Sequence, residues 1–370
     1  MIDPLRIGVI GCGAISGAYL AAAKKFPILR ILAVADINGA AAEAKANEFN
    51  VSRVCSVCEL LADPSVELVL NLTVPGAHAS IALDAIAAGK HTYSEKPLGV
   101  SRDEGRKILR AATEKGVRVG CAPDTFLGAG MQTARKIIDD GVIGRPVAFT
   151  AFMMNRGHET WHPNPDFYYQ PGGGPMFDMG PYYLTALLFL LGPIRRIQGM
   201  ASIAVPRRTI TSQPRAGTAI TVRTPDHVVG NVEFVGGAVG TLIQSFATWH
   251  PAVDEKQPIE IFGTDGAMRA PDPNRFDLPV SIRLAHDPAW QEAPHAFVQG
   301  YDRSVGLADM AYAIRSGRKH RCNGELAFAA LDAMQGFFDS SAGGHDYRPA
   351  APFERPAPMP AHLPFGTLDS

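Results

Sequence analysis

Residues 5–16 read Leu5-Arg6-Ile7-Gly8-Val9-Ile10-Gly11-Cys12-Gly13-Ala14-Ile15-Ser16, an apolar strand pattern that passes through a glycine loop into a helix pattern. Gly11 permits a tight turn, and Gly13 lets the main chain approach a pyrophosphate at the positive end of the helix. Ser16 replaces the third glycine of such loops and is still small enough for close packing. The loop is therefore predicted to bind a dinucleotide through Gly11, Gly13, Ala14 and Ile15.

The first third of the chain continues this alternation of strand and helix patterns. Strands are predicted at Leu5–Ile10, Leu29–Ala35, Val51–Val54, Leu68–Leu72, His91–Ser94 and Arg118–Cys121. Helices are predicted at Ser16–Lys25, Asn38–Phe49, Ala77–Ala88 and Ser101–Lys115. Strands separated by helices indicate a doubly wound parallel sheet, the Rossmann arrangement.

The pattern changes after Thr125, where strand patterns follow one another without helices between them. These lie at residues 194–205, 218–223, 228–234, 239–246 and 259–262, after a strand at 148–154. Helices are predicted at 131–138, 176–191, 305–315 and 324–341. Consecutive strands favour a largely antiparallel sheet. We therefore predict a Rossmann domain at 1–124, a second α/β domain at 125–345 and an extended, proline-rich tail at 346–370.

Composition limits the classes of function. The chain has 370 residues, 46% of them hydrophobic, which suffices for two cores. Its net charge of −1 predicts no binding to nucleic acid or to anionic membranes. Five cysteines form an odd, sparse set that indicates a reducing compartment, and Cys55-Ser56-Val57-Cys58 is interpreted as two incidental thiols. No signal peptide and no membrane-length apolar segment is present, so a cytoplasmic protein is predicted.

Asp36 ends the second predicted strand. A carboxylate at this place accepts hydrogen bonds from the ribose hydroxyls and repels a 2′-phosphate. No arginine or lysine follows it directly, so NAD is favoured over NADP. Asp36 could instead cap the next helix. We favour the nucleotide role because the loop and the acid occur together at the expected spacing.

Two further turns lie where parallel strands end, the edge at which open α/β sheets bind ligands. The first is Thr73-Val74-Pro75 with His78, and Thr73, Pro75 and His78 are candidates for the nicotinamide side of the cofactor. His78 also fits local hydrogen bonding at a helix start. The second turn is Glu95-Lys96-Pro97, where Lys96 can reach a cofactor or a substrate.

Together with Gly172-Gly173-Gly174-Pro175-Met176-Phe177-Asp178-Met179-Gly180-Pro181-Tyr182, these motifs resemble the glucose-fructose oxidoreductase, inositol dehydrogenase and rhizopine-catabolism (Gfo/Idh/MocA) family. The resemblance spans nearly the whole chain. It implies a Rossmann domain followed by an α/β domain with an open, mostly antiparallel sheet that mediates assembly, here into a homodimer or homotetramer. It also implies oxidation or reduction of a secondary alcohol on a sugar, a cyclitol or a related molecule.

The resemblance also implies roles for the turn at Lys96. Glu95 and Lys96 would contact the cofactor, Lys96 would also touch the substrate, and the peptide bond before Pro97 would be cis. The chain departs from the family where a common histidine is Tyr182 and an aspartate is Thr185. These departures leave the substrate open.

Asp178 and Tyr182 are four residues apart, so in one helix they would share a face. We predict Tyr182 as the proton acceptor. A tyrosine has an ordinary pKa of about 10, but a nearby Lys96 ammonium and an oxidised nicotinamide would favour the phenolate. Lys96 would stabilise developing alkoxide charge and Asp178 would orient a neighbouring hydroxyl. In the alternative, Asp178 caps a helix, Pro181 lies in its first turn, and Tyr182 packs in the core.

The loop at residues 156–169 precedes the glycine-rich segment and combines aromatic, imidazole and carboxylate groups. Such groups suit a carbohydrate, and Trp161, His162 and Tyr168 are candidate substrate contacts. The alternative is a surface loop whose aromatics pack on the domain beneath. The spacing of its histidines predicts no metal site.

These patterns predict an NAD-dependent dehydrogenase that acts on CH–OH groups of a small carbohydrate or polyol. Two alternatives remain open. One is a glycosidase that uses bound NAD for transient oxidation of the sugar. The other is a sensor that binds a dinucleotide without catalysis.

Overall fold

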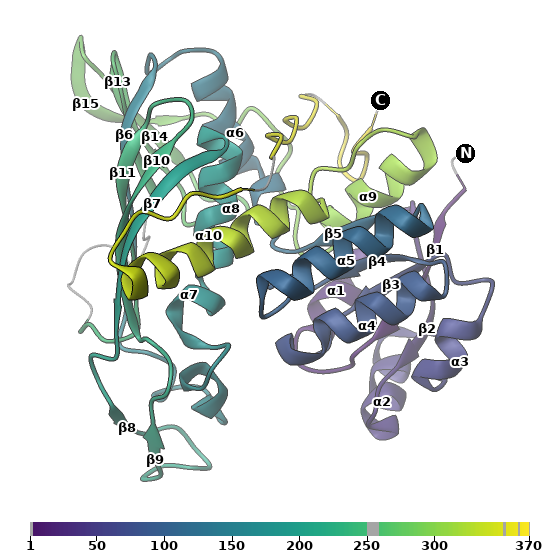
Figure 1. Cartoon of the computed structure of the whole chain (residues 1–370). Helices are drawn as coiled ribbons and strands as arrows, with labels where there is room; N and C mark the ends of the chain where they lie inside the picture. The colour runs from purple at the N-terminus through teal and green to yellow at the C-terminus, as the bar shows by residue number, and fades with distance from the viewer. Residues whose placement is uncertain (1–2, 250–258, 351–352, 362, 370) are drawn as a thin grey trace. The chain divides into compact units, whose positions relative to one another are not determined.

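The computed structural model of the protein describes residues 3–249, 259–350, 353–361 and 363–369. They form two compact units, each assembled from separated segments (Figure 1). The first is drawn from Met1–Gln132, His295–Leu331 and Pro356–Ser370, and the second from Thr133–Pro294 and Asp332–Arg355. The predicted domain boundaries after residues 124 and 345 stay a prediction, because compactness alone does not define an independently folding domain.

The first unit contains a five-stranded parallel sheet of order β2-β1-β3-β4-β5. Its strands are β1 (Leu5–Ile10), β2 (Leu29–Ala35), β3 (Leu68–Asn71), β4 (His91–Ser94) and β5 (Val119–Cys121). Its early helices are α1 (Ser16–Ala23), α2 (Gly39–Phe49), α3 (Val57–Ala62), α4 (Pro75–Ala87) and α5 (Arg102–Lys115). Because β2 and β4 lie on opposite sides of β1 and β3, right-handed crossovers place α1 and α4 on opposite faces. The predicted doubly wound Rossmann sheet is confirmed.

One predicted strand of this unit is wrong. Val51–Val54 forms no strand but only an isolated bridge between Val34 and Val54. The chain then enters α3, a helix that was not predicted from the sequence. Ser56 and Glu59 form a capping box there: the Ser56 hydroxyl accepts the Glu59 N–H at 3.2 Å, and the Glu59 carboxylate accepts the Ser56 N–H at 2.8 Å. A serine followed three residues later by a glutamate is a recognised start of a helix and would have predicted it.

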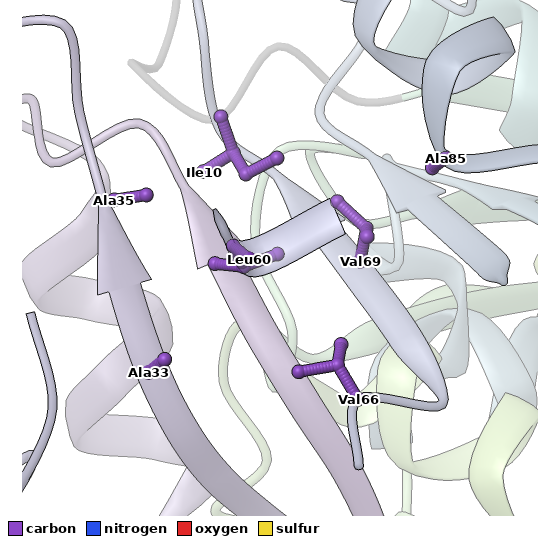
Figure 2. Close-up of a cluster of buried hydrophobic side chains, with 7 residues drawn as sticks. All are labelled: Ile10, Ala33, Ala35, Leu60, Val66, Val69 and Ala85. Carbon is purple, nitrogen blue, oxygen red and sulfur yellow. The ribbon is translucent and has the colours of Figure 1, made fainter. Parts of the chain in front are cut away.

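Helix α3 contributes to the core of the first unit through Leu60 (Figure 2). Leu60 reaches the sheet because Gly8 of β1 has no side chain; a Cβ there would stand 2.7 Å from a Leu60 methyl carbon. Burying a leucine side chain stabilises the fold by about 2 kcal/mol. Around it lie small and branched apolar residues, which are Ile10, Ala33, Ala35, Val66, Val69 and Ala85.

Later segments complete this unit and lead into the second. They are η1 (Thr125–Leu127), α6 (Ala129–Asp139), α9 (Val305–Ser316) and α10 (Gly324–Gly343). Both α6 and α10 begin in the first unit and end in the second. Among the described residues, no helix has the length and hydropathy that crossing a bilayer requires.

The second unit contains an eight-stranded sheet of order β15-β14-β13-β12-β6-β11-β10-β7. All neighbouring strands are antiparallel except β6 and β11, so the predicted mostly antiparallel sheet is confirmed. Its strands are β6 (Pro146–Met154), β7 (Ile194–Ser202), β10 (His227–Phe234), β11 (Val239–Ser245), β12 (Ile259–Gly263), β13 (Gly266–Ala270), β14 (Val280–Leu284) and β15 (Asp287–Ala293). A separate ribbon pairs β8 (Arg207–Thr209) with β9 (Ala219–Thr221), and the unit's other elements are η2 (Pro165–Tyr169), α7 (Gly174–Asp178) and α8 (Gly180–Leu191).

The two faces of this sheet differ. Burial alternates along β10, as expected when one face of an antiparallel sheet is covered. The covered face packs against α10, where Gly199 and Gly230 leave space for Phe337. The opposite face carries exposed apolar side chains, including Phe152 and Met200.

Candidate functional site

The glycine loop lies at the carboxyl end of β1. Gly11 has a φ of +102°, and a Cβ there would stand 2.6 Å from the Leu72 carbonyl, so the turn requires glycine. Gly13 is exposed, and a Cβ on it would meet nothing within 4 Å. The Ser16 hydroxyl donates to the Gly13 carbonyl at 2.7 Å and holds the start of α1. The open space at Gly13 fits a pyrophosphate on the helix end.

Asp36 joins the end of β2 to this loop. One carboxylate oxygen accepts the Cys12 N–H at 2.6 Å and the other accepts the Asn38 N–H at 2.8 Å. A carboxylate has about four acceptor positions, so Asp36 retains capacity for ribose hydroxyls. Burial, and then the Asp36 charge, raise the pKa of the Cys12 thiol to about 11. Cys12 therefore stays protonated at neutral pH and does not act as a nucleophile.

Large apolar side chains are exposed at the same edge. Ile15, Ile37 and Val74 are 36%, 100% and 69% exposed, and they follow β1, β2 and β3. Exposed apolar groups at the ligand-binding edge of a parallel sheet suit the flat faces of nucleotide rings. The first unit therefore presents both the polar and the apolar groups that a dinucleotide needs.

Buried side chains hold the next two turns. The Asn71 amide donates to the His78 carbonyl at 3.0 Å, and its oxygen accepts the Thr73 hydroxyl at 2.7 Å. His78 is 1% exposed, and its ring nitrogens lie 2.7 Å from the Pro97 carbonyl and 3.0 Å from the Thr73 carbonyl. The His78 ring thus links the turn that carries Thr73 and Pro75 to the turn that carries Lys96.

Lys96 lies just beyond the carboxyl end of β4, and the Lys96–Pro97 peptide bond is cis, as the family resemblance implied. Glu95 fixes this turn. One of its carboxylate oxygens accepts the Tyr19 hydroxyl at 2.8 Å and the other accepts the Lys96 N–H at 2.9 Å. Glu95 is 8% exposed, so its carboxylate holds the turn from within, whereas Lys96 is half-buried.

In the second unit, the prediction of one helix across residues 176–191 is wrong. Helix α7 ends at Asp178 and α8 begins at Gly180. Pro181 lies in the first turn of α8 and has no N–H to continue the ladder of α7. The shared helix face of Asp178 and Tyr182 therefore does not follow from their spacing. Tyr182 is 6% exposed and lies in the first turn of a helix that is almost wholly buried.

Asp178 pairs with His158, which was not among the predicted site residues. Its carboxylate oxygen lies 3.0 Å from Nε2 of His158, in the loop that follows β6. The His158 ring is packed between aromatic rings, with centroids 4.0 Å from Tyr168, 4.6 Å from Phe246 and 5.1 Å from Trp161. The only signal for His158 in the sequence was its place in the loop rich in histidine and aromatics.

A buried ion-pair network anchors this loop. Arg208 of β8, with a side chain 1% exposed, donates to the carboxylates of Glu159 and Asp226 at 2.8 Å each. It also donates to the carbonyls of Arg156 and Phe246 at 2.7 Å each. Burial alone would lower the pKa of Arg208, but the Asp226 hydrogen bond and the charges around it raise it. Arg208 therefore ties the loop to β8 and to the segments around Asp226 and Phe246 within the second unit.

The three predicted substrate contacts lie together in this loop. Trp161 is 61% exposed, and its ring packs edge to face against His162 at 5.4 Å. Burial, and then the neighbouring His158, lower the pKa of His162. His162 also packs against Tyr168 at 5.4 Å. Phe167, which was not selected, is 52% exposed beside them.

Both the N-terminal and the C-terminal part of the chain match families of known proteins. Residues 5–122 match the oxidoreductase family with an NAD-binding Rossmann fold, and residues 131–269 match the Gfo/Idh/MocA C-terminal domain. Curated relatives include 1,5-anhydro-D-fructose reductase of Ensifer adhaerens, 27% identical over 71% of this chain and 74% of that protein. Inositol 2-dehydrogenase of Agrobacterium fabrum is 28% identical over 85% of this chain and 87% of its own.

A solved structure of levoglucosan dehydrogenase with NADH and L-sorbose is similar in fold. It superimposes with a TM-score of 0.81 at 20% identity, covering 94% of this chain and 99% of that one. The fold and the groups at the carboxyl edge of the sheet define an NAD-binding oxidoreductase. The chain belongs to the Gfo/Idh/MocA family.

Proposed function

We propose that the protein is an NAD-dependent dehydrogenase that oxidises a secondary hydroxyl of a sugar, a cyclitol or a sugar derivative. The observation that carries this is Lys96, positioned by Glu95 and His78 on the strand edge that also bears the glycine loop and Asp36. Relatives named for anhydrofructose, inositol and levoglucosan support a carbohydrate or polyol as substrate.

The cofactor would be held by the first unit. The main chain at Gly11, Gly13, Ala14 and Ile15 would receive the pyrophosphate, and Asp36 the ribose hydroxyls. The exposed Ile37 and Val74 would cover apolar ring faces, and the Thr73-Val74-Pro75 turn, tied to Lys96 through His78, would flank the nicotinamide side. When bound, NAD accepts a hydride from the substrate carbon.

Lys96 and Tyr182 would act on the hydroxyl that is oxidised. In this proposal Tyr182 takes the hydroxyl proton, and the ammonium of Lys96 donates to the same oxygen and stabilises its developing negative charge. Asp178 would accept a hydrogen bond from a neighbouring hydroxyl and so orient the sugar ring. Each of these roles is a prediction that substitution can test.

Trp161, His162 and Tyr168 would form the substrate side of the second unit. The exposed Trp161 indole suits the apolar face of a sugar ring. His162, with its lowered pKa, would be neutral at pH 7. Its Nδ1 accepts the Asn164 N–H at 3.0 Å, so its Nε2–H would donate a hydrogen bond to a substrate hydroxyl oxygen. The predictions of a cytoplasmic location and of a homodimer or homotetramer stay predictions.

The test is formation of NADH, followed by absorbance, against a panel of cyclitols, aldoses, anhydrosugars and sugar acids. Lys96→Met should lower kcat/KM about 100-fold or more while NADH still binds. Lys107→Met changes an exposed lysine of α5 in the same unit and should leave both unchanged. Full turnover by Lys96→Met would refute the mechanism. Cleavage of a glycosidic bond without net NADH would favour the glycosidase instead.

A further inference from the structure

His158 and Asp178 form a largely buried pair, of which the proposed chemistry uses only Asp178. The pair joins the loop after β6 to the last residue of α7, twenty positions along the chain. Side chains of His158 and Asp178 are 10% and 16% exposed. A contact between two such residues fixes one against the other only if the histidine itself is held.

The main chain of His158 is held at both of its polar groups. Its N–H donates to the Tyr169 hydroxyl at 2.9 Å, and its carbonyl accepts the N–H of His162 at 2.9 Å. The Tyr169 hydroxyl in turn donates to Glu159, which Arg208 anchors. The main chain of His158 is therefore connected, through Tyr169 and Glu159, to the buried ion pairs of Arg208.

The surroundings of the ring select its tautomer. An ionised carboxylate only accepts hydrogen bonds, so the contact with Asp178 requires a proton on Nε2 of His158. The other ring nitrogen, Nδ1, is buried and has no hydrogen-bond partner within the part of the chain that the structure describes. The rings of Tyr168, Phe246 and Trp161 enclose the imidazole. A proton on Nδ1 would be a buried donor without an acceptor, which is costly, so the surroundings favour the tautomer with its proton on Nε2.

A buried acceptor without a partner is uncommon in native proteins and calls for an explanation. A phenylalanine at this place would fill the same aromatic surroundings without an unsatisfied nitrogen. What phenylalanine could not supply is the N–H that points at Asp178. The role of the imidazole is therefore the hydrogen bond to the Asp178 carboxylate rather than the packing of its ring.

We propose that His158 is a positioning residue that holds the Asp178 carboxylate through its Nε2–H, so that Asp178 is oriented before the substrate arrives. This inference rests on the proposed function, in which Asp178 receives a substrate hydroxyl. A carboxylate fixed in one rotamer loses less conformational entropy on binding and keeps its direction in the transition state. The aromatic enclosure maintains the tautomer that makes this possible.

The kinetic test compares two substitutions at one position. His158→Phe keeps a ring and removes the donor, whereas the amide of His158→Gln places an N–H close to the place of Nε2. We expect His158→Phe to lower kcat/KM by about 10- to 100-fold, the range of a hydrogen bond to a charged group, with NADH affinity unchanged. His158→Gln should recover activity to within about threefold of wild type, since it restores a donor.

The matched control is His227→Phe. His227 of β10 also makes a ring hydrogen bond, to the Ser245 hydroxyl at 2.9 Å, and lies in the same unit. It should retain wild-type kinetics. Wild-type kcat/KM in His158→Phe would overturn the proposal. So would equal losses in the Phe and Gln variants, because a packing role alone would give that result. If His158→Phe does not fold, a loss of more than about threefold in kcat/KM for His158→Gln would overturn the proposal, because the amide supplies the same donor.

A second measurement does not depend on turnover. Nitrogen-15 NMR of the wild-type protein, with His158 assigned by its absence from the His158→Gln spectrum, reports which ring nitrogen carries the proton. We expect the Nε2–H tautomer at neutral pH. The Nδ1–H tautomer would overturn the proposed contact even in an active enzyme. Conversely, a protein that oxidises no polyol but shows Nε2–H would refute the proposed function while leaving the contact standing.

Discussion

Replacing Arg208 with methionine should destabilise the second unit strongly. Arg208 is the only cation that the described residues place against Glu159 and Asp226, whose side chains are 6% and 0% exposed. Methionine fills similar volume but leaves two buried carboxylates without their counter-charge. It also removes donors from the carbonyls of Arg156 and Phe246.

Removing one partner of a buried ion pair costs about 3–5 kcal/mol, because the remaining charge stays in a poorly solvated place. Native domains are stable by about 5–15 kcal/mol, so the loss is a large fraction of the whole. With an m-value of about 2 kcal/mol/M, the urea midpoint should fall by about 2 M. Tryptophan fluorescence follows this unit selectively, because the chain's three tryptophans all lie in it, at Trp161, Trp249 and Trp290.

The matched control is Arg215→Met, which breaks the Arg215–Asp166 ion pair of the same unit. Those side chains are 34% and 41% exposed, so the change should cost less than about 1 kcal/mol. Adding Glu159→Gln to Arg208→Met should recover part of the loss, since one stranded charge is then removed. A midpoint for Arg208→Met equal to that of the control would refute the claim that buried charge anchors the loop.

Three further predictions concern the first unit. Gly13→Val should keep the urea midpoint near that of wild type, since no atom lies within 4 Å of the new Cβ. It should nevertheless weaken NADH binding, measured by calorimetry, at least about tenfold. Gly39→Val, at an equally open position in α2, is the control and should bind NADH as tightly as wild type does. Asp36→Ala should reduce the preference for NAD over NADP, measured as the ratio of kcat/KM values; an unchanged ratio would contradict its ribose role. Burial lowers the pKa of His320 to about 4, below its unfolded value of about 6.5. As the pH falls, the unfolded state therefore takes up a proton at a higher pH than the folded state does. Stability should therefore be full above pH 6.5 and fall as the pH drops toward 4, and His320→Gln should remove this component from thermal unfolding scans.

Much of the first unit could be predicted because its signals are local. A glycine loop between a strand and a helix, an acid at the next strand end and an alternating pattern are all read within about forty residues. The two wrong predictions in this unit, a strand and a missing helix, also have local causes. Asn50, with a φ of +57°, ends α2, and the following segment makes only the bridge from Val54 to Val34 of β2. The Ser56–Glu59 capping box, a local signal for α3, was not among the predicted helix starts.

The second unit was harder to predict for a physical reason. Its short strands β8 and β13 carry too few apolar residues to show a period, and they exist because neighbouring strands supply hydrogen-bond partners. The break between α7 and α8 follows from Pro181, whose place in a first helical turn the sequence offered as the alternative to one continuous helix. A proline has no N–H to continue the helix, which favours this alternative over the four-residue interval.

By itself the sequence determined the class of protein: a Rossmann unit for NAD, a second unit with an antiparallel sheet, and Lys96 at a strand end. These features depend on residue types at short, fixed intervals in the sequence. Local backbone geometry is enough to determine where such residues lie in the fold. Only the tertiary structure decided what surrounds Asp178. His158 lies twenty residues away and Arg208 contacts acids 49 and 18 positions distant, and no periodicity connects such residues. Their pairing arises where loop, ribbon and helix pack together, and buried charge and hydrogen bonding then hold them there.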